Sequence, residues 1–171
     1  MSPHTIYIYY KTITKENNMD ANHTKDACRI LNEIIEFELA GVVRYTHYSL
    51  MVRGPYRLSI VQFLKDQANE SLMHAQQAGE LLTGLGGHPS QKVAHIEETH
   101  KHEIHNILEE SLQHEQKAIS LYKDLLKIVT DQSIYLEEYA RGMIGQEEMH
   151  TMELQKMLRD YQPVSFDESE Q

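Results

Sequence analysis

Apolar residues recur at intervals of three and four along four long stretches of the chain, the spacing that places side chains on one face of an α-helix. The stretches cover about residues 24–52, 56–85, 98–129 and 133–159. Alternation with a period of two, which indicates a strand, is confined to the N-terminal segment. The pattern predicts four helices of roughly 27–31 residues, each about 40–47 Å long at 1.5 Å per residue.

Helix-breaking residues separate these stretches. Gly54 and Pro55 interrupt the first two, because proline excludes the preceding residue from helical conformation. Turn-forming residues at 130–133 separate the last two. The second stretch ends in three glycines and a proline at 84–89, and a longer connection follows around 86–96. Two short breaks and one long connection predict an all-α four-helix bundle with one long crossover between the second and third helices.

The bundle is expected to span residues 23–160 as a single domain, because the chain length suffices for one core and no second region is apparent. Residues 1–22 are expected to form an N-terminal arm, either disordered or the product of a mis-assigned start, since Met19 directly precedes the first helix. Residues 161–171 form an acidic tail that is expected to fray.

The composition argues against several classes of protein. No window is apolar over the ~18 residues that a membrane-spanning helix needs, and the first ten residues lack the pattern of a secretory signal. A lone cysteine, Cys28, builds neither a disulfide framework nor a thiolate metal cage, which favours the cytoplasm. The net charge of −10 argues against nucleic-acid partners and suits a protein that attracts cations. We therefore expect a soluble cytoplasmic protein with no membrane and no nucleic acid as partner.

Each predicted helix places a glutamate in or beside the middle of its apolar stripe, at about 100° per residue. The second and fourth helices add a histidine on the same side. In chain order, the polar residues on the stripes are Glu38, Glu70 and His74, Glu115, and Glu147 and His150.

Ionised carboxylates in an apolar core cost several kcal/mol or more unless something neutralises them. No lysine or arginine shares the central positions, whereas two divalent cations would balance four glutamates. Taken singly, each of these residues could lie at the edge of the bundle, or in the core with its polar group hydrogen-bonded. Four helices with the same anomaly indicate a two-metal site, and oxygen ligands with two imidazoles suit iron or manganese, with zinc as a competitor.

At these residues the sequence resembles the bacterioferritin family of the ferritin-like superfamily, whose di-metal sites take a Glu from two helices and a Glu-x-x-His from the other two. Glu147-Glu148-Met149-His150 matches that motif. Glu38-Leu-Ala-Gly-Val-Val-Arg-Tyr45 resembles the family's first-helix segment, and Glu115-Gln-Lys-Ala-Ile its third-helix segment. The likeness covers about residues 27–158.

The resemblance implies a ferritin-like bundle that binds two iron(II) ions per chain, oxidises them with dioxygen, and stores or passes on iron(III). Glu38, Glu115 and Glu147 would be catalytic ligands, with Glu115 and one partner bridging the metals. His74 and His150 would each cap one metal. Tyr45, on the same face as Glu38, would donate an electron or hydrogen-bond a ligand. A homodimer or larger homo-oligomer is expected.

Three features depart from the family pattern. Position 71 is serine, and the nearest glutamate, Glu70, precedes His74 by four residues instead of three. We therefore hypothesise that Glu70, and not Ser71, completes the site, through a π-bulge or a skewed ligand set. The apolar sequence after the fourth helix is too short for the family's fifth helix. The methionine that would hold haem falls near Leu72, with Met73 one position away, so haem is not expected.

A second polar set lies on the predicted third helix, about 100° from its apolar stripe. Its members fall within ~40° of one another around the axis, and they are Glu98, His102, His105 and Glu109. A solvated face is the common explanation for such a set. A surface or entry site for metal is the alternative.

Three functions compete. The first is a ferroxidase or iron-storage subunit, and the second is a two-metal peroxidase or catalase-like protein that uses the same ligands with peroxide. The third is a metal-free helical bundle that acts by protein association. The single Cys28 excludes a rubrerythrin with its own cysteine-ligated iron, and the lack of a terminal lysine cluster disfavours a DNA-protecting mini-ferritin.

Overall fold

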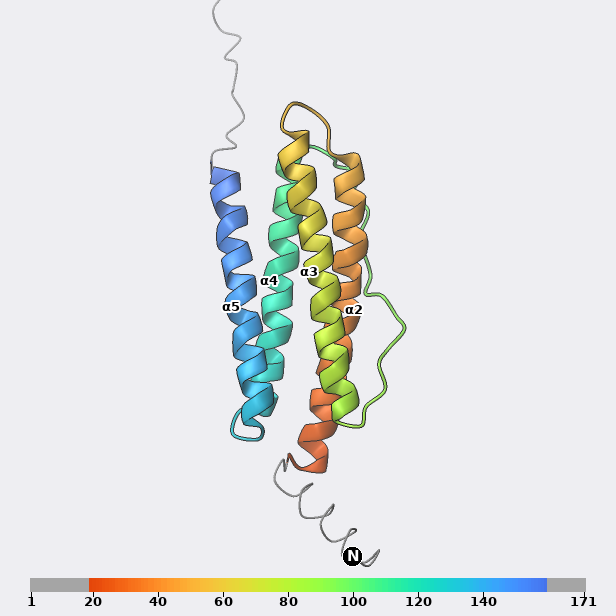
Figure 1. The fold of residues 1–171 in the computed structure, drawn as a ribbon, viewed down its shortest axis with the longest axis vertical. Coiled ribbons are helices and arrows are strands. Elements are labelled where there is room, and N and C mark those ends of the chain that lie inside the picture. The colour runs from red at the N-terminus through yellow and green to blue at the C-terminus, as the bar shows by residue number, and fades with distance from the viewer. Residues whose placement is uncertain (1–18, 160–171) are drawn as a thin grey trace, which may run out of the picture.

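The computed structural model describes residues 19–159, which form four long helices side by side (Figure 1). The helices are α2 (Ala21–Met51), α3 (Arg57–Gly84), α4 (Ile104–Val129) and α5 (Ile134–Arg159). α2 and α5 run in one direction, and α3 and α4 in the other (Figure 1). α2 packs along α3, α4 packs along α5, and α2 also packs against α4. The predicted all-α four-helix bundle with one long crossover is confirmed.

The ends of the first two helices follow from local sequence. The carboxylate of Asp20 accepts hydrogen bonds from two backbone N–H groups of the first turn, both at 2.9 Å, and so caps α2. The helix consequently begins at Ala21, inside the predicted arm. At the other end, Gly54 has a φ of 94°, which favours glycine, and Pro55 follows it. This turn reverses the chain into α3.

The connection between α3 and α4 covers residues 85–103 and is longer than predicted, since α4 begins at Ile104 instead of near residue 98. His100 has a φ of 56°, a left-handed conformation that an α-helix does not accommodate. Its backbone N–H donates to Glu98 Oε1 at 2.8 Å, so a side chain supplies the acceptor that a helix would otherwise provide. The prediction of helix over residues 98–103 was therefore wrong.

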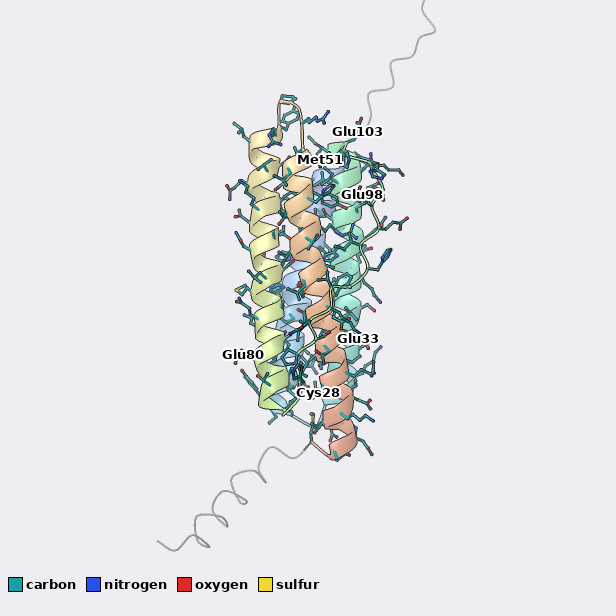
Figure 2. The ribbon with its side chains drawn as sticks, turned by 90° about the vertical axis from the view of Figure 1, so that its right-hand side faces the viewer. Cys28, Glu33, Met51, Glu80, Glu98 and Glu103 are labelled. Atoms are coloured by element: carbon teal, nitrogen blue, oxygen red, sulfur yellow. The ribbon has the colours of Figure 1, made fainter. Side chains whose placement is uncertain are left out.

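The crossover is fixed against the outside of α2 by specific hydrogen bonds (Figure 2). The backbone N–H of Ala94 donates to the carbonyl oxygen of Glu36 at 2.9 Å. The backbone N–H of Ser90 donates to Asn32 Oδ1 at 2.7 Å, and its hydroxyl donates to Glu36 Oε1 at 2.5 Å. The segment therefore has a defined path along the bundle.

The apolar core has two parts, separated along the bundle by a polar layer. One part joins the first halves of α2 and α5 to the C-terminal halves of α3 and α4, with Leu31, Ile34, Leu82, Tyr122 and Leu125 among its buried residues. The other joins the second halves of α2 and α5 to the first halves of α3 and α4, with Tyr45, Leu64, Ile107, Leu108 and Leu154 among them. Between the two parts lie the buried side chains of Glu38, His74, Glu115 and Glu147.

Most of the predicted arm and the whole predicted tail lie outside the described residues, which exclude 1–18 and 160–171. None of the helices in the described part of the chain has the length and apolarity that crossing a membrane requires.

Candidate metal centre

A small cavity lies between the four helices at the level of the polar layer. The side chains from the predicted ligand positions line it, namely Glu38 from α2, Glu70 and His74 from α3, Glu115 from α4, and Glu147 and His150 from α5. Glu38, His74, Glu115 and Glu147 each expose 4% or less of their surface. Glu70 and His150 are partly exposed and form the rim. The stripe positions of all four helices therefore converge on one cavity.

The ligand atoms form two groups of three that share Glu147. Its Oε1 lies 3.1 Å from His74 Nδ1, and its Oε2 lies 3.1 Å from His150 Nδ1. Glu38 Oε1, 3.6 Å from His74 Nδ1, completes the first group, and Glu115 Oε2, 3.6 Å from His150 Nδ1, completes the second. Within each group the atoms lie within 4.8 Å of one another, close enough to surround one ion. Glu147 is the carboxylate common to both groups, while the resemblance implied Glu115 and one unspecified partner as the bridging pair.

Two buried tyrosines hold the carboxylates in a crossed arrangement. The Tyr45 hydroxyl of α2 donates to Glu115 Oε1 of α4, and the Tyr122 hydroxyl of α4 donates to Glu38 Oε1 of α2 at 2.8 Å. Of the two roles expected for Tyr45, the structure contains the hydrogen bond to a predicted ligand. Sequence reasoning missed Tyr122, although it follows Glu115 by the same seven residues that separate Tyr45 from Glu38.

Glu70 lies at the rim of the cavity, beside His150. Its Oε2 is 3.4 Å from His150 Nε2, on the opposite side of the ring from the nitrogen that faces Glu147. Gln67 Nε2 also donates to Glu70 Oε2 at 3.4 Å. Glu70 belongs to neither three-ligand group among the described residues. α3 is α-helical from Arg57 to Gly84, so the serine at position 71 is not bypassed by a π-bulge.

A buried histidine that the apolar pattern does not single out also lines the cavity. His114 stacks on Phe37 with ring centroids 4.2 Å apart, and burial lowers its pKa to about 4, so the ring is neutral. Its Nε2 has no hydrogen-bond partner among the described residues. A Cβ added to Gly41 would lie 2.8 Å from this nitrogen and 2.7 Å from Ser71 Oγ. Gly41 is therefore the residue that lets α2 approach α3 and α4 at the cavity.

The charges of the layer depend on protons when no metal is bound. Burial raises the pKa of Glu38, and raises that of Glu115 to about 8. Burial lowers the pKa of His74, but its contacts with Glu147 and Glu38 outweigh burial and raise it to about 10. Contacts with Glu115, Glu147 and Glu70 raise the pKa of His150 to about 12. Both imidazoles are thus protonated at neutral pH.

These residues fit a pair of divalent ions. No lysine or arginine from the described chain lines the cavity, so the imidazolium protons are its only cationic groups. Two divalent ions would displace those protons and balance the four carboxylates. Both groups combine carboxylate oxygens with an imidazole nitrogen, a donor set that suits iron or manganese. The Nδ1 atoms of His74 and His150 already face the shared Glu147.

Comparisons with known proteins identify the family and the fold. Residues 28–163 match the model of the ferritin-like domain family. The structure is similar to a ferritin-like diiron-carboxylate protein from Bacillus anthracis, with 24% identity and a TM-score of 0.76, over 82% of this chain and 99% of that one. It is also similar to the bacterioferritin of Desulfovibrio desulfuricans, with 23% identity and a TM-score of 0.71, over 81% of each chain.

A third similar structure is the bacterioferritin-related dodecameric thioferritin of Bacteroides fragilis, with 21% identity and a TM-score of 0.72, over 80% of this chain and 86% of that one. No curated protein matches the sequence. At these identities the solved structures establish the fold alone, and the family match rests on the sequence of most of the bundle. The chain belongs to the ferritin-like domain family.

Proposed function

We propose that this protein binds two iron(II) ions per chain in the central cavity, oxidises them with dioxygen, and stores or sequesters the iron(III). The observation that carries the proposal is the buried layer in which two three-ligand groups share one carboxylate. The family match supports it, and the Bacillus anthracis protein of the same fold is described as a diiron-carboxylate protein.

Each candidate ligand of the cavity has a role in this proposal. One ion would be held by Glu38, His74 and Glu147, and the other by Glu115, Glu147 and His150. The hydroxyls of Tyr45 and Tyr122 orient the two carboxylates that are not shared, because each donates a hydrogen bond to one of them.

Iron(II) would enter at the rim, because Glu70 and His150 are the partly exposed ligands of an otherwise buried set. The contact with His150 lowers the pKa of Glu70, so its carboxylate is ionised and pairs with the imidazolium until an incoming cation displaces that proton. Glu70 is the first carboxylate that an incoming ion would meet, and it lies next to the histidine of the second group. We therefore assign Glu70 to uptake and to completing the ligand set there.

The chemistry that iron supplies is the loss of one electron from each ion. Two iron(II) ions give two electrons, and dioxygen takes these with two protons to form hydrogen peroxide. The same two electrons and two protons would convert hydrogen peroxide into two water molecules, which is the peroxidase alternative. Comparing the oxidation rates with the two oxidants distinguishes the reactions.

The proposal is tested by stopped-flow oxidation of iron(II), with Glu147→Ala as the site variant and Glu148→Ala as its control. Glu148 is the next residue on α5 and is exposed, so its removal leaves the cavity intact. We expect rapid oxidation in the control and its loss in Glu147→Ala, with unchanged helical content. Wild-type rates in Glu147→Ala, or wild-type protein that retains no metal, would contradict the proposal.

A homo-oligomer is part of the proposal, since the Bacteroides fragilis neighbour is described as dodecameric. The native mass in solution tests this point independently of metal binding. A monomer would exclude iron storage in a protein shell. Iron(II) oxidation at the cavity would then be tested by the stopped-flow rates alone.

A further inference from the structure

A second cluster of metal-ligating side chains lies outside the central cavity, where the crossover meets α2. His47 projects from α2, and Glu98 and His102 come from the crossover. His47 Nε2 lies 3.2 Å from Glu98 Oε2, and one ligand atom from each of the three residues lies within 4.8 Å of the others. Nine residues separate His47 from Glu38, about 13 Å along the helix at 1.5 Å per residue. The cluster shares no residue with the central cavity.

Two ring nitrogens in the described part of this cluster are buried without a hydrogen bond. Neither His47 Nε2 nor His102 Nδ1 makes a hydrogen bond within the described part of the chain. Glu98 Oε2 is close to His47 Nε2, but the pair is not aligned as a hydrogen bond. Ligands ~2.0–2.1 Å from a tetrahedral ion lie about 3.3 Å apart. The 3.2 Å separation therefore matches two ligands of one ion.

The turn that carries Glu98 is already ordered around it. Glu98 Oε1 accepts the backbone N–H of His100 at 2.8 Å, which leaves Oε2 on the side of His47. The left-handed conformation of His100, at a φ of 56°, is one that non-glycine residues adopt only when the surroundings impose it. Thr99 Oγ1 donates to Glu110 Oε1 of α4 at 2.7 Å and ties the same turn to the bundle.

We propose that His47, Glu98 and His102 bind one divalent transition-metal ion, zinc(II) or iron(II), and that this ion fastens the crossover to α2. Two imidazoles and a carboxylate favour such ions over magnesium or calcium, which prefer oxygen ligands alone. The side chains of His47 and Glu98 are 39% and 45% exposed, so the site opens to solvent and leaves room for water as a further ligand. Figure 2 shows Glu98 on the crossover near the end of the bundle that carries Met51 and Glu103.

On the predicted third helix, Glu98 and His102 share one face with His105 and Glu109. In the structure, His105 Nε2 instead lies 3.2 Å from Glu109 Oε1 within α4, while the first two residues precede the helix. The proposed site thus joins the crossover to a helix more than forty residues earlier in the sequence. It does not depend on the function proposed for the central cavity.

The test is zinc(II) binding by the full-length protein, counted by equilibrium dialysis with metal analysis. The site variant is His47→Ala/His102→Ala, and the matched control is His95→Ala, which removes an exposed histidine from the same crossover. We expect the site variant to lose one zinc(II) per chain, and the control to retain the wild-type number. In the milder Glu98→Gln variant, the affinity of this site for zinc(II) should fall more than about 100-fold. Losing an outer-shell partner of a metal ligand costs up to about 100-fold, and Glu98 is proposed as a direct ligand.

Glu147→Ala separates this proposal from the previous one, because it removes the shared ligand of the central cavity and leaves the crossover site intact. Zinc(II) that is lost in Glu147→Ala but unchanged in His47→Ala/His102→Ala would overturn the crossover site alone. Retention of one zinc(II) at the crossover in Glu147→Ala would support it. A diffraction peak at the zinc absorption edge within ~2.3 Å of His47 Nε2 is the expected structural result, and its absence at saturating zinc(II) would also overturn the proposal.

Discussion

Glu147 belongs to both three-ligand groups, whereas Glu38 and Glu115 belong to one each, so their removal should affect metal binding to different extents. Metal that binds only the folded protein stabilises it by about 2.7 kcal/mol per site at a concentration of 100 times Kd. Two sites therefore contribute about 5.4 kcal/mol. For a domain of this size each kcal/mol raises Tm by about 2–4 °C, so the metal should raise the wild-type Tm by about 11–22 °C.

Glu147→Ala should abolish this rise, because each ion loses a ligand. Glu38→Ala should leave about half of it, 5–11 °C, because the group of Glu115 and His150 stays complete. Glu148→Ala, one residue further along α5 and exposed, should retain the full rise. The assay is thermal unfolding followed by circular dichroism, with and without manganese(II), which is stable to air and prefers carboxylate-rich sites. A full loss in Glu115→Ala with only half lost in Glu147→Ala would refute the assignment and make Glu115 the shared ligand.

Three further predictions concern protons, packing and haem. The pKa of His74 in the metal-free protein is raised above its ordinary 6.5, to about 10, so the stabilisation from its protonated form is complete below pH 6.5 and is lost as the pH rises through 10. Urea unfolding in chelator should show the free energy of unfolding falling over that range. Calorimetry at pH 7 should detect about three protons released on metal binding, from His74, His150 and the carboxyl of Glu115, whose pKa is raised to about 8; a flat profile with no proton release would contradict both. Gly41→Ala places a Cβ within 2.8 Å of two side-chain atoms on facing helices and should lower the free energy of unfolding by about 1–3 kcal/mol. Gly79→Ala, with open space around it, should raise the free energy of unfolding by up to about 1 kcal/mol. Equal effects of the two substitutions on Tm would refute the close approach at Gly41. Haem addition should give no strong Soret band, because leucine stands at position 72, and a band at about one haem per two subunits would point to the neighbouring methionine.

The four helices could be predicted because each buries an apolar stripe whose period is visible in one sequence. The start of α4 could not. The apolar spacing continues back to about residue 98, but the carboxylate of Glu98 binds the backbone of His100 and holds it in a left-handed conformation. At His100 this local side-chain hydrogen bond prevents the helix that the apolar spacing predicts, and the spacing of apolar residues does not reveal such a bond.

The same periodicity predicts the candidate ligands. A glutamate inside an apolar stripe is unusual on any helix, regardless of which residues face it from the other helices. Which residues pair was not accessible, because pairing depends on how the helices are shifted along one another. Tyr45 contacts Glu115 on α4 and not a residue of its own helix. The sequence does not single out Tyr122 or His114, because an isolated aromatic or histidine on a core face is common. Only their contacts in the structure distinguish them, with Glu38 for Tyr122 and with Phe37 for His114.

The paired centre is tested most directly by diffraction at the iron absorption edge from crystals loaded with iron(II) without oxygen. We predict two iron peaks per chain in the central cavity, one beside His74 and one beside His150, each within ~2.0–2.6 Å of an oxygen of Glu147. A single peak, or two peaks that both lie more than about 3 Å from Glu147, would contradict a centre built on this shared carboxylate.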